Sequence, residues 1–328
     1  MKTIIFLVTM IVSAPYCMVY EVEKVVKKVK KDSTTFIRKL EVVNFFDDYL
    51  QYFNDYVTDT SNTSSLKTIA ESYHLPTFQM TPGVPLKLVS SIEDLVKGVR
   101  GFLNQFIVEG VSSIKWEKLD IQMLTEKMAY VYTIVGHYKD NGDVFNKVGA
   151  DYFVFKTDGV WKIATLILYS PEPYNNLKIK NEVYEAVFLN LKNYNDILSN
   201  DDIDSDYNPQ VISATGKINV PAINISQAGD FVLFESKQQI IADRKSFIFS
   251  IKSKGATYIN YDTVQIKMLS ESTAISSNIA SINTKDGVPL FKISVTYLFN
   301  RTADGWKIVF RTFHKPETIL NLNPEKTS

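Results

Sequence analysis

One segment of this chain occurs twice. Residues 152–172 read YFVFKTDGVWKIATLILYSPE, and residues 297–317 read YLFNRTADGWKIVFRTFHKPE. Trp161 and Trp306 lie 145 positions apart in these segments. The same offset continues upstream without a gap, pairing Phe102 with Phe247, Gly110 with Gly255, Ile114 with Ile259, Glu126 with Glu271 and Gly142 with Gly287. An ungapped match of this extent predicts two tandem copies of one domain.

The composition fits two ordinary globular domains and no highly charged partner. A chain of 328 residues is long enough for two domains, each with its own core. Hydrophobic residues make up 45% and charged residues 22%, which is typical of globular protein. Lys+Arg and Asp+Glu both total 36, so no global field attracts nucleic acid. We therefore expect no nucleic-acid partner.

The N-terminus has the pattern of a signal peptide over residues 1–17. Lys2 precedes an apolar run, Thr3–Val12, and small residues follow it. The run is shorter than the roughly 20 residues of a spanning helix, so no membrane span is expected. An uncleaved anchor or a buried strand is the alternative. The pattern predicts a secreted or extracytoplasmic protein, and Cys17, the only cysteine, offers no disulfide or cysteine nucleophile.

The chain divides into six consecutive segments. After the signal peptide, a basic leader helix over 18–37 carries valines at helical spacing among lysines. Such a helix can lie on a membrane surface or rest its valines on the first domain; the lack of large apolar residues favours the second interpretation. We expect a first domain at 38–172, a linker at 173–181, a second domain at 182–320 and a tail at 321–328.

Within each copy, helical periodicity gives way to strand periodicity. The first domain shows helices at 38–57, about 66–73 and 91–108, an irregular crossing around Pro76–Pro85, and then four strands at 114–124, 127–139, 145–156 and 161–169. The second domain repeats this order, with helices at 181–198 and 237–253, a crossing at 209–228, and strands at 257–269, 274–283, 290–300 and 306–314. Tight Gly turns between the strands predict antiparallel meanders and an α+β fold.

The repeated turn and strand resemble a known superfamily. The sequences DGVWKI at 158–163 and DGWKI at 304–308, each after an aromatic strand, are similar to those of the nuclear transport factor 2-like superfamily, more narrowly its SnoaL-like polyketide cyclase-type members. The resemblance implies two cone-shaped domains, each with three helices on a strongly bent antiparallel sheet around an apolar pocket. The superfamily includes isomerases, dehydratases and cyclases alongside proteins that only bind, so it leaves the activity open.

The resemblance also implies where catalytic groups would lie, because enzymes of the superfamily place Asp, His or Tyr in the pocket. Asp151 is the first candidate, as a general base on an aromatic strand face, where its counterpart is Thr296. The alternatives are that Asp151 faces solvent or pairs with a lysine. His137 and Tyr132 on the preceding strand are further catalytic candidates. A hydrogen-bonded structural histidine is the alternative for His137.

Aromatic and basic side chains supply candidate ligand-binding residues. These are Tyr52, Tyr56, Tyr130, Phe153, Tyr297 and Arg311. On the first long helix, Tyr52 and Tyr56 share a face, and the tyrosines could instead pack by their rings. Arg311 and His314 lie on opposite faces of the last strand, so one of them could serve an interface between the domains.

No motif indicates a metal or another cofactor, since no His/Asp/Glu cluster has metal spacing and no Gly-rich loop follows a strand. Sequons at Asn62, Asn224 and Asn300 would accept glycans in a secreted eukaryotic protein. Our leading hypothesis is a secreted, non-enzymatic pseudo-dimer that binds a small apolar ligand, or a protein partner through its sheets. The alternatives are a cofactor-free lyase or isomerase with Asp151 as base, and a structural interaction module.

Overall fold

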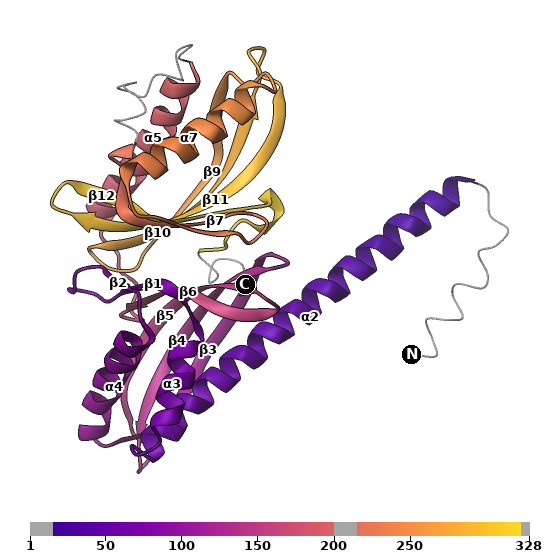
Figure 1. Cartoon of the computed structure of the whole chain (residues 1–328). Helices are drawn as coiled ribbons and strands as arrows, with labels where there is room; N and C mark the ends of the chain where they lie inside the picture. The colour runs from indigo at the N-terminus through magenta and orange to yellow at the C-terminus, as the bar shows by residue number, and fades with distance from the viewer. Residues whose placement is uncertain (1–15, 200–214, 323–328) are drawn as a thin grey trace.

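The structure of the protein is a computed structural model that describes residues 16–199 and 215–322, with side chains from residue 33 onward. Two domains of the same architecture follow one another along the chain (Figure 1). The predicted signal peptide falls almost entirely outside the described residues. Among those described, no helix is long and apolar enough to cross a membrane.

The first domain packs three helices against one face of a six-stranded mixed sheet. Its elements are α2 (Tyr16–Thr58), α3 (Thr63–Glu71), β1 (Tyr73–Met80), β2 (Lys87–Val89), α4 (Ile92–Val108), β3 (Val111–Thr125), β4 (Met128–Lys139), β5 (Val144–Thr157) and β6 (Val160–Tyr169). The strand order is β2-β1-β6-β5-β4-β3, with only the β1–β6 pair parallel. Ser91 caps α4 by accepting the Asp94 N–H at 3.1 Å, as its sequence predicts.

The second domain repeats this sheet strand for strand. Its described elements are α5 (Leu177–Leu198), β7 (Ile218–Ile225), β8 (Phe231–Phe234), α7 (Lys237–Lys252), β9 (Tyr258–Met268), β10 (Thr273–Asn283), β11 (Pro289–Thr302), β12 (Gly305–His314) and a short 3₁₀ helix, Pro316–Thr318. The order is β8-β7-β12-β11-β10-β9. The α+β prediction with two tandem copies is therefore confirmed. Helix α5 begins at Leu177, within the segment that the sequence analysis assigns to the linker.

The predicted irregular crossings were wrong, because the first contains most of β1 and the second contains β7; β2 and β8 lie just beyond them. Proline removes a donor from a strand, and Pro76 lies within β1 and Pro221 within β7. Both strands pass the proline at an irregularity. The register of β1 on β6 shifts between Tyr73 and Phe78, and that of β7 on β12 shifts between Ile218 and Ile223. Each sheet is consequently mixed and not purely antiparallel.

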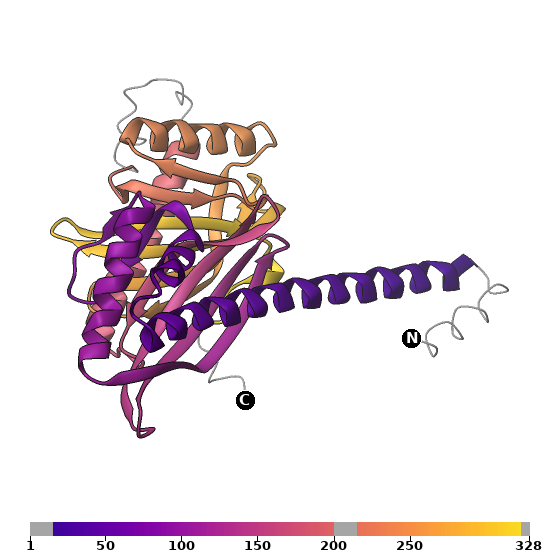
Figure 2. The ribbon, with the colours of Figure 1, turned by 60° about the horizontal axis from the view of Figure 1, so that its bottom comes forward.

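Helix α2 is one continuous helix, where the sequence predicted a leader helix and a separate first helix. Its C-terminal half packs on the first domain, with Val42 and Phe46 fully buried. Its N-terminal half projects away from both domains (Figures 1 and 2). The leader segment is therefore continuous with the first helix of the domain. Phe36, at the point of departure, is 68% exposed.

The two domains pair through the outer faces of their sheets. One continuous apolar cluster includes Phe153 and Phe155 of the first sheet and Ile275 and Phe310 of the second. Phe153 stacks on Phe310 with ring centroids 4.6 Å apart. Separate clusters fill the space between helices and sheet inside each domain. Each sheet is thus buried on both faces, one against its own helices and one against the other domain.

Candidate functional site

A cavity of about 200 Å³ lies inside the first domain, between helices α2 and α4 and the inner face of the sheet. Its wall is mostly apolar, with Phe53 from α2, Phe102 from α4 and Leu168 from β6 among the lining residues. None of the described residues that line it carries a formal charge. An enclosed apolar cavity of roughly 150 Å³ in another protein stays dry and binds benzene. The space therefore suits a molecule of about one aromatic ring.

The cavity reaches the surface beside Gly98 of α4. Gly98 and Thr81, which follows β1, are both exposed, and both line the cavity. A Cβ atom added at Gly98 would meet no atom within 4 Å. A glycine inside a helix costs about 1 kcal/mol relative to alanine, and packing does not require one here. Its absent side chain leaves the entrance open.

The second copy shows what the same positions look like when they are filled. With the 145-residue offset, Gly98 corresponds to Asp243, Val99 to Arg244, Leu166 to Arg311, Leu168 to Phe313 and Val148 to Ile293. All five changes replace a small or apolar side chain with a larger one. At these positions larger side chains, among them Arg244 and Arg311 at 1% and 5% exposed, therefore occupy the helix–sheet interior of the second domain.

Arg311, a predicted ligand-binding residue, belongs to this filling. Its guanidinium pairs with Asp243 at 2.7 Å and donates to the Asn224 amide oxygen at 2.9 Å and to the Tyr194 hydroxyl at 3.0 Å. Burial alone would lower the pKa of Arg311, but Tyr194 and Asp243 together raise it, so the ion pair is firmly held. Asn224 is buried in this network, which is incompatible with a glycan on its predicted sequon.

Polar groups line the cavity of the first domain at a few points. Tyr49 of α2 and Tyr73 of β1 share a hydrogen bond, with their hydroxyl oxygens 2.7 Å apart. Tyr152 of β5 also lines the cavity. His137 of β4 lies in the wall, 2% exposed and stacked on Phe106. Burial lowers the pKa of His137, an effect that Asn146 opposes, so the imidazole is neutral near pH 7.

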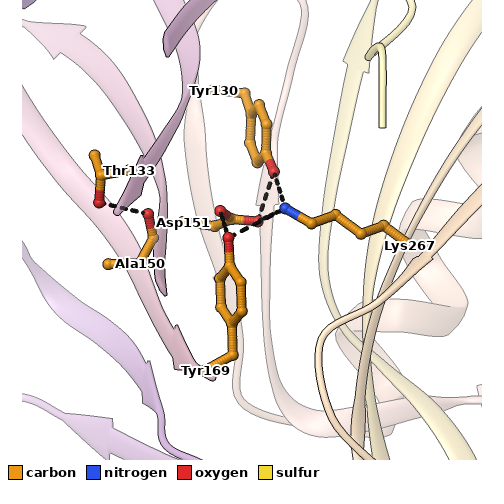
Figure 3. A network of polar contacts seen from close by, with 6 residues as sticks. All are labelled: Tyr130, Thr133, Ala150, Asp151, Tyr169 and Lys267. Atoms are coloured by element: carbon orange, nitrogen blue, oxygen red, sulfur yellow. Dashed lines mark hydrogen bonds and ion pairs between the residues drawn. The ribbon is translucent and has the colours of Figure 1, made fainter. Parts of the chain in front are cut away.

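Asp151, the principal catalytic candidate, does not lie in this cavity. Ala150 and Tyr152 of β5 line the cavity, whereas Asp151 between them points to the opposite face, toward the second domain. Its carboxylate accepts hydrogen bonds from Tyr130 at 2.5 Å and Tyr169 at 2.6 Å (Figure 3). The predicted position as a base in the apolar pocket is therefore wrong.

A lysine of the second domain completes this network. Lys267 of β9 reaches across the interface, with its ammonium 3.1 Å from Asp151 and 3.1 Å from the Tyr169 hydroxyl (Figure 3). The ammonium also lies 4.3 Å from the centre of the Tyr132 ring. Burial and then the charge of Asp151 raise the pKa values of Tyr130 and Tyr169, which therefore remain protonated donors. We refer to Tyr130, Asp151, Tyr169 and Lys267 as the interdomain latch.

The other predicted site residues are dispersed. Tyr130 belongs to the latch, and Tyr132 and Phe153 also lie on the interdomain face. Tyr56 lies away from the cavity and donates a hydrogen bond of 3.1 Å to the Asn104 side chain. Tyr52 packs against the first core. Tyr297 is buried in the second domain, where its hydroxyl accepts from Asn190 at 3.2 Å. Of the predicted residues, His137 alone lines the cavity.

Sequence reasoning missed most of the cavity wall, including Tyr73, Trp116 and Gly98. Tyr73 begins strand β1, where the sequence predicted the end of a short helix, and Gly98 falls on a helix where glycine has no packing signal. The offset between the copies would have pointed to Gly98, because its counterpart is the charged Asp243. Among the residues with described side chains, no group of three or more His, Cys, Asp or Glu is placed to hold a metal ion.

Comparisons with known proteins agree with the tandem architecture. A family model described as NTF2-like protein (DUF6841) matches residues 40–171 and 193–316. No curated protein matches. Similar solved structures include Aln2 from a Streptomyces species, at 12% identity over 40% of this chain and 88% of that one, with a TM-score of 0.32. An NTF2-like protein with a cystatin-like fold from Novosphingobium aromaticivorans matches at 10% identity over 46% and 90%, with a TM-score of 0.34.

Proposed function

The chain belongs to the NTF2-like protein family (DUF6841), and we propose that its first domain binds a small apolar molecule in the cavity between α2, α4 and the sheet. The observation that carries this proposal is the contrast between the copies. The first domain keeps an uncharged cavity of about 200 Å³ with an entrance at Gly98, where the second domain has Asp243 paired with Arg311. A pocket with an opening and no buried charge favours an apolar ligand.

In this proposal the second domain supports the first. Its interior is filled, and its sheet covers the outer face of the first sheet. The sheets are therefore already used for pairing within the chain, which disfavours a protein partner on those faces. The lyase or isomerase alternative with Asp151 as base is disfavoured, because Asp151 is fully buried in the latch, away from the cavity. We also propose, from the signal-peptide pattern of residues 1–17, that binding takes place outside the cytoplasm.

The test is to give the first domain the side chains of the second. A Val148→Ile/Leu168→Phe variant carries the residues found at the corresponding positions of the filled copy. Toluene binding to the full chain would be followed by ligand-observed NMR and by the shift in unfolding temperature. Wild type should bind toluene, and the filled variant should lose at least tenfold in affinity.

The matched control is Val160→Ile, an enlargement at a position of the same sheet that is 53% exposed and away from the cavity. It should bind toluene as wild type does. Absence of toluene binding to wild type, or equal binding by the filled variant, would reject the cavity as a ligand site.

A further inference from the structure

We infer that the natural ligand of this cavity is an uncharged molecule with an apolar body and one hydrogen-bond-accepting oxygen, which the tyrosine hydroxyls of the wall bind. The inference deepens the proposed function and rests on it. It comes from hydrogen-bond donors of the cavity wall that have no partner among the described residues.

Three tyrosines from three different elements line the cavity, Tyr49, Tyr73 and Tyr152. They are 2%, 4% and 4% exposed. The Tyr49–Tyr73 bond uses one of the three hydroxyl protons, whichever residue donates it. No hydrogen bond is found for the other two protons among the described residues. Trp116, also in the wall, adds an indole N–H that has no partner among the described residues.

Unpaired donors in an apolar space are costly, which indicates what is missing. A buried donor without an acceptor loses about 1–3 kcal/mol of solvation. One oxygen atom with two lone pairs, such as a ketone or ester carbonyl, accepts from two donors at once. A charged ligand is disfavoured, because the wall offers no formal charge among its described residues and His137 is neutral. An uncharged carbonyl compound fits both conditions.

The hydroxyls remain donors over the whole physiological pH range. Burial raises the pKa of Tyr49, and the neighbouring Tyr73 and Tyr152 raise it further. Burial is also the main reason that the pKa values of Tyr73 and Tyr152 are raised. None of the three ionises near pH 7, so the cavity presents protons and not a phenolate.

In the second domain the corresponding tyrosine is hydrogen-bonded to a neighbouring side chain. Asn54 of α2 bonds both backbone groups of Ile114, and Asn195 of α5 does the same to Ile259. This shared contact aligns the two helices and makes Asn190 the counterpart of Tyr49. There the amide of Asn190 donates to the Tyr297 hydroxyl at 3.2 Å, and its oxygen accepts from Arg244 at 2.8 Å. Tyr297 is the counterpart of Tyr152, so the tyrosine at this position is hydrogen-bonded in the second copy, whereas no hydrogen bond is found for the Tyr152 hydroxyl among the described residues.

The experiment compares two probes of nearly the same shape, acetophenone and α-methylstyrene, in which a C=CH₂ group replaces the carbonyl. Binding of each to the full chain would be measured by isothermal titration calorimetry or by ligand-observed NMR. A neutral hydrogen bond contributes a net 0.5–1.5 kcal/mol, so acetophenone should bind about three- to tenfold more tightly. A Tyr152→Phe variant should reduce this preference while leaving α-methylstyrene affinity unchanged. Tyr73→Phe tests the other free hydroxyl proton.

The control is Tyr56→Phe, which removes a hydroxyl of the same helix that bonds Asn104 outside the cavity and should keep the wild-type preference. Thermal unfolding of the unliganded variants verifies that each is folded. Equal binding of the two probes to wild type, or an unchanged preference in both cavity variants, would overturn the inference but leave the proposed function standing. If neither probe binds and toluene also fails, the proposed function falls and the inference falls with it.

Discussion

Lys267→Met should destabilise the protein by about 2 kcal/mol, because it removes the lysine that the second domain contributes to the latch. The ammonium lies 3.1 Å from a carboxylate that is itself fully buried, and the lysine side chain is 20% exposed. Methionine keeps the length and apolar stem of lysine, so the packing on Tyr132 is largely retained. The substitution therefore tests the charge and not the volume.

The magnitude follows from what remains around Asp151. Leaving a buried charge wholly unpaired costs about 3–5 kcal/mol. Here Tyr130 and Tyr169 still donate to the carboxylate at 2.5 and 2.6 Å, distances expected for charge-assisted hydrogen bonds. The loss is then that of one hydrogen bond to a charged group, about 1.5–3 kcal/mol. Partial exposure of Lys267 places the expected value in the lower half of this range.

Urea unfolding of the full chain, monitored by tryptophan fluorescence, measures this loss. Lys147→Met is the matched control, since it removes an ion pair with Glu117 at 2.5 Å in which the two side chains are 42% and 25% exposed. A surface pair contributes about 0–1 kcal/mol. If Lys267→Met lowered the free energy of unfolding no more than Lys147→Met does, the latch would not stabilise the domain pairing as argued.

Three further outcomes follow from the geometry. Gly98→Ala should raise the free energy of unfolding by about 1 kcal/mol in urea titration, because alanine has a higher helix propensity than glycine and the new Cβ contacts no other atom. A lower free energy of unfolding in this variant would contradict an open entrance at Gly98. Gly149→Ala should cost about 1–3 kcal/mol in the same assay, because its Cβ would lie 2.5 Å from the Tyr169 ring; unchanged stability would show that the ring adapts. Burial lowers the pKa of His314 to about 4. The contribution of its neutral imidazole to the free energy of unfolding is therefore fully present above about pH 6.5 and falls by roughly 3 kcal/mol as the pH drops to 4. His314→Gln should show a shallower pH dependence of unfolding in this window, and an unchanged slope would assign the effect to other groups.

Sequence patterns predicted the meander strands well, because the signals there are local. The Gly turns at 142, 159, 287 and 305 all have positive φ, and β3–β6 and β9–β12 begin and end within about three residues of their predicted bounds. Strands β1 and β7 were missed because their identity depends on partners far away in the chain. Tyr73 pairs with Ile163 and Ile218 with Ile308, and no local period reports such a contact around a proline.

The candidate site was harder to predict, for a reason visible in β5. Residues 149–155 are all buried, since one face of the strand meets the helices and the other meets the second domain. Alternation correctly grouped Asp151 with Phe153, but with two buried faces it could not say which one is the cavity. Local patterns in one chain thus identify faces and turns, whereas the choice between inner and outer face requires the tertiary pairing.

The arrangement of β5 also connects the two halves of the molecule. Ala150 and Tyr152 line the cavity, and Asp151 between them is held by Lys267 of the other domain. Strand β5, which forms part of the cavity wall, is therefore held on its outer face by a residue of the second domain. A ligand that orders this wall stabilises the same strand to which Lys267 binds, so ligand binding and domain pairing should strengthen each other.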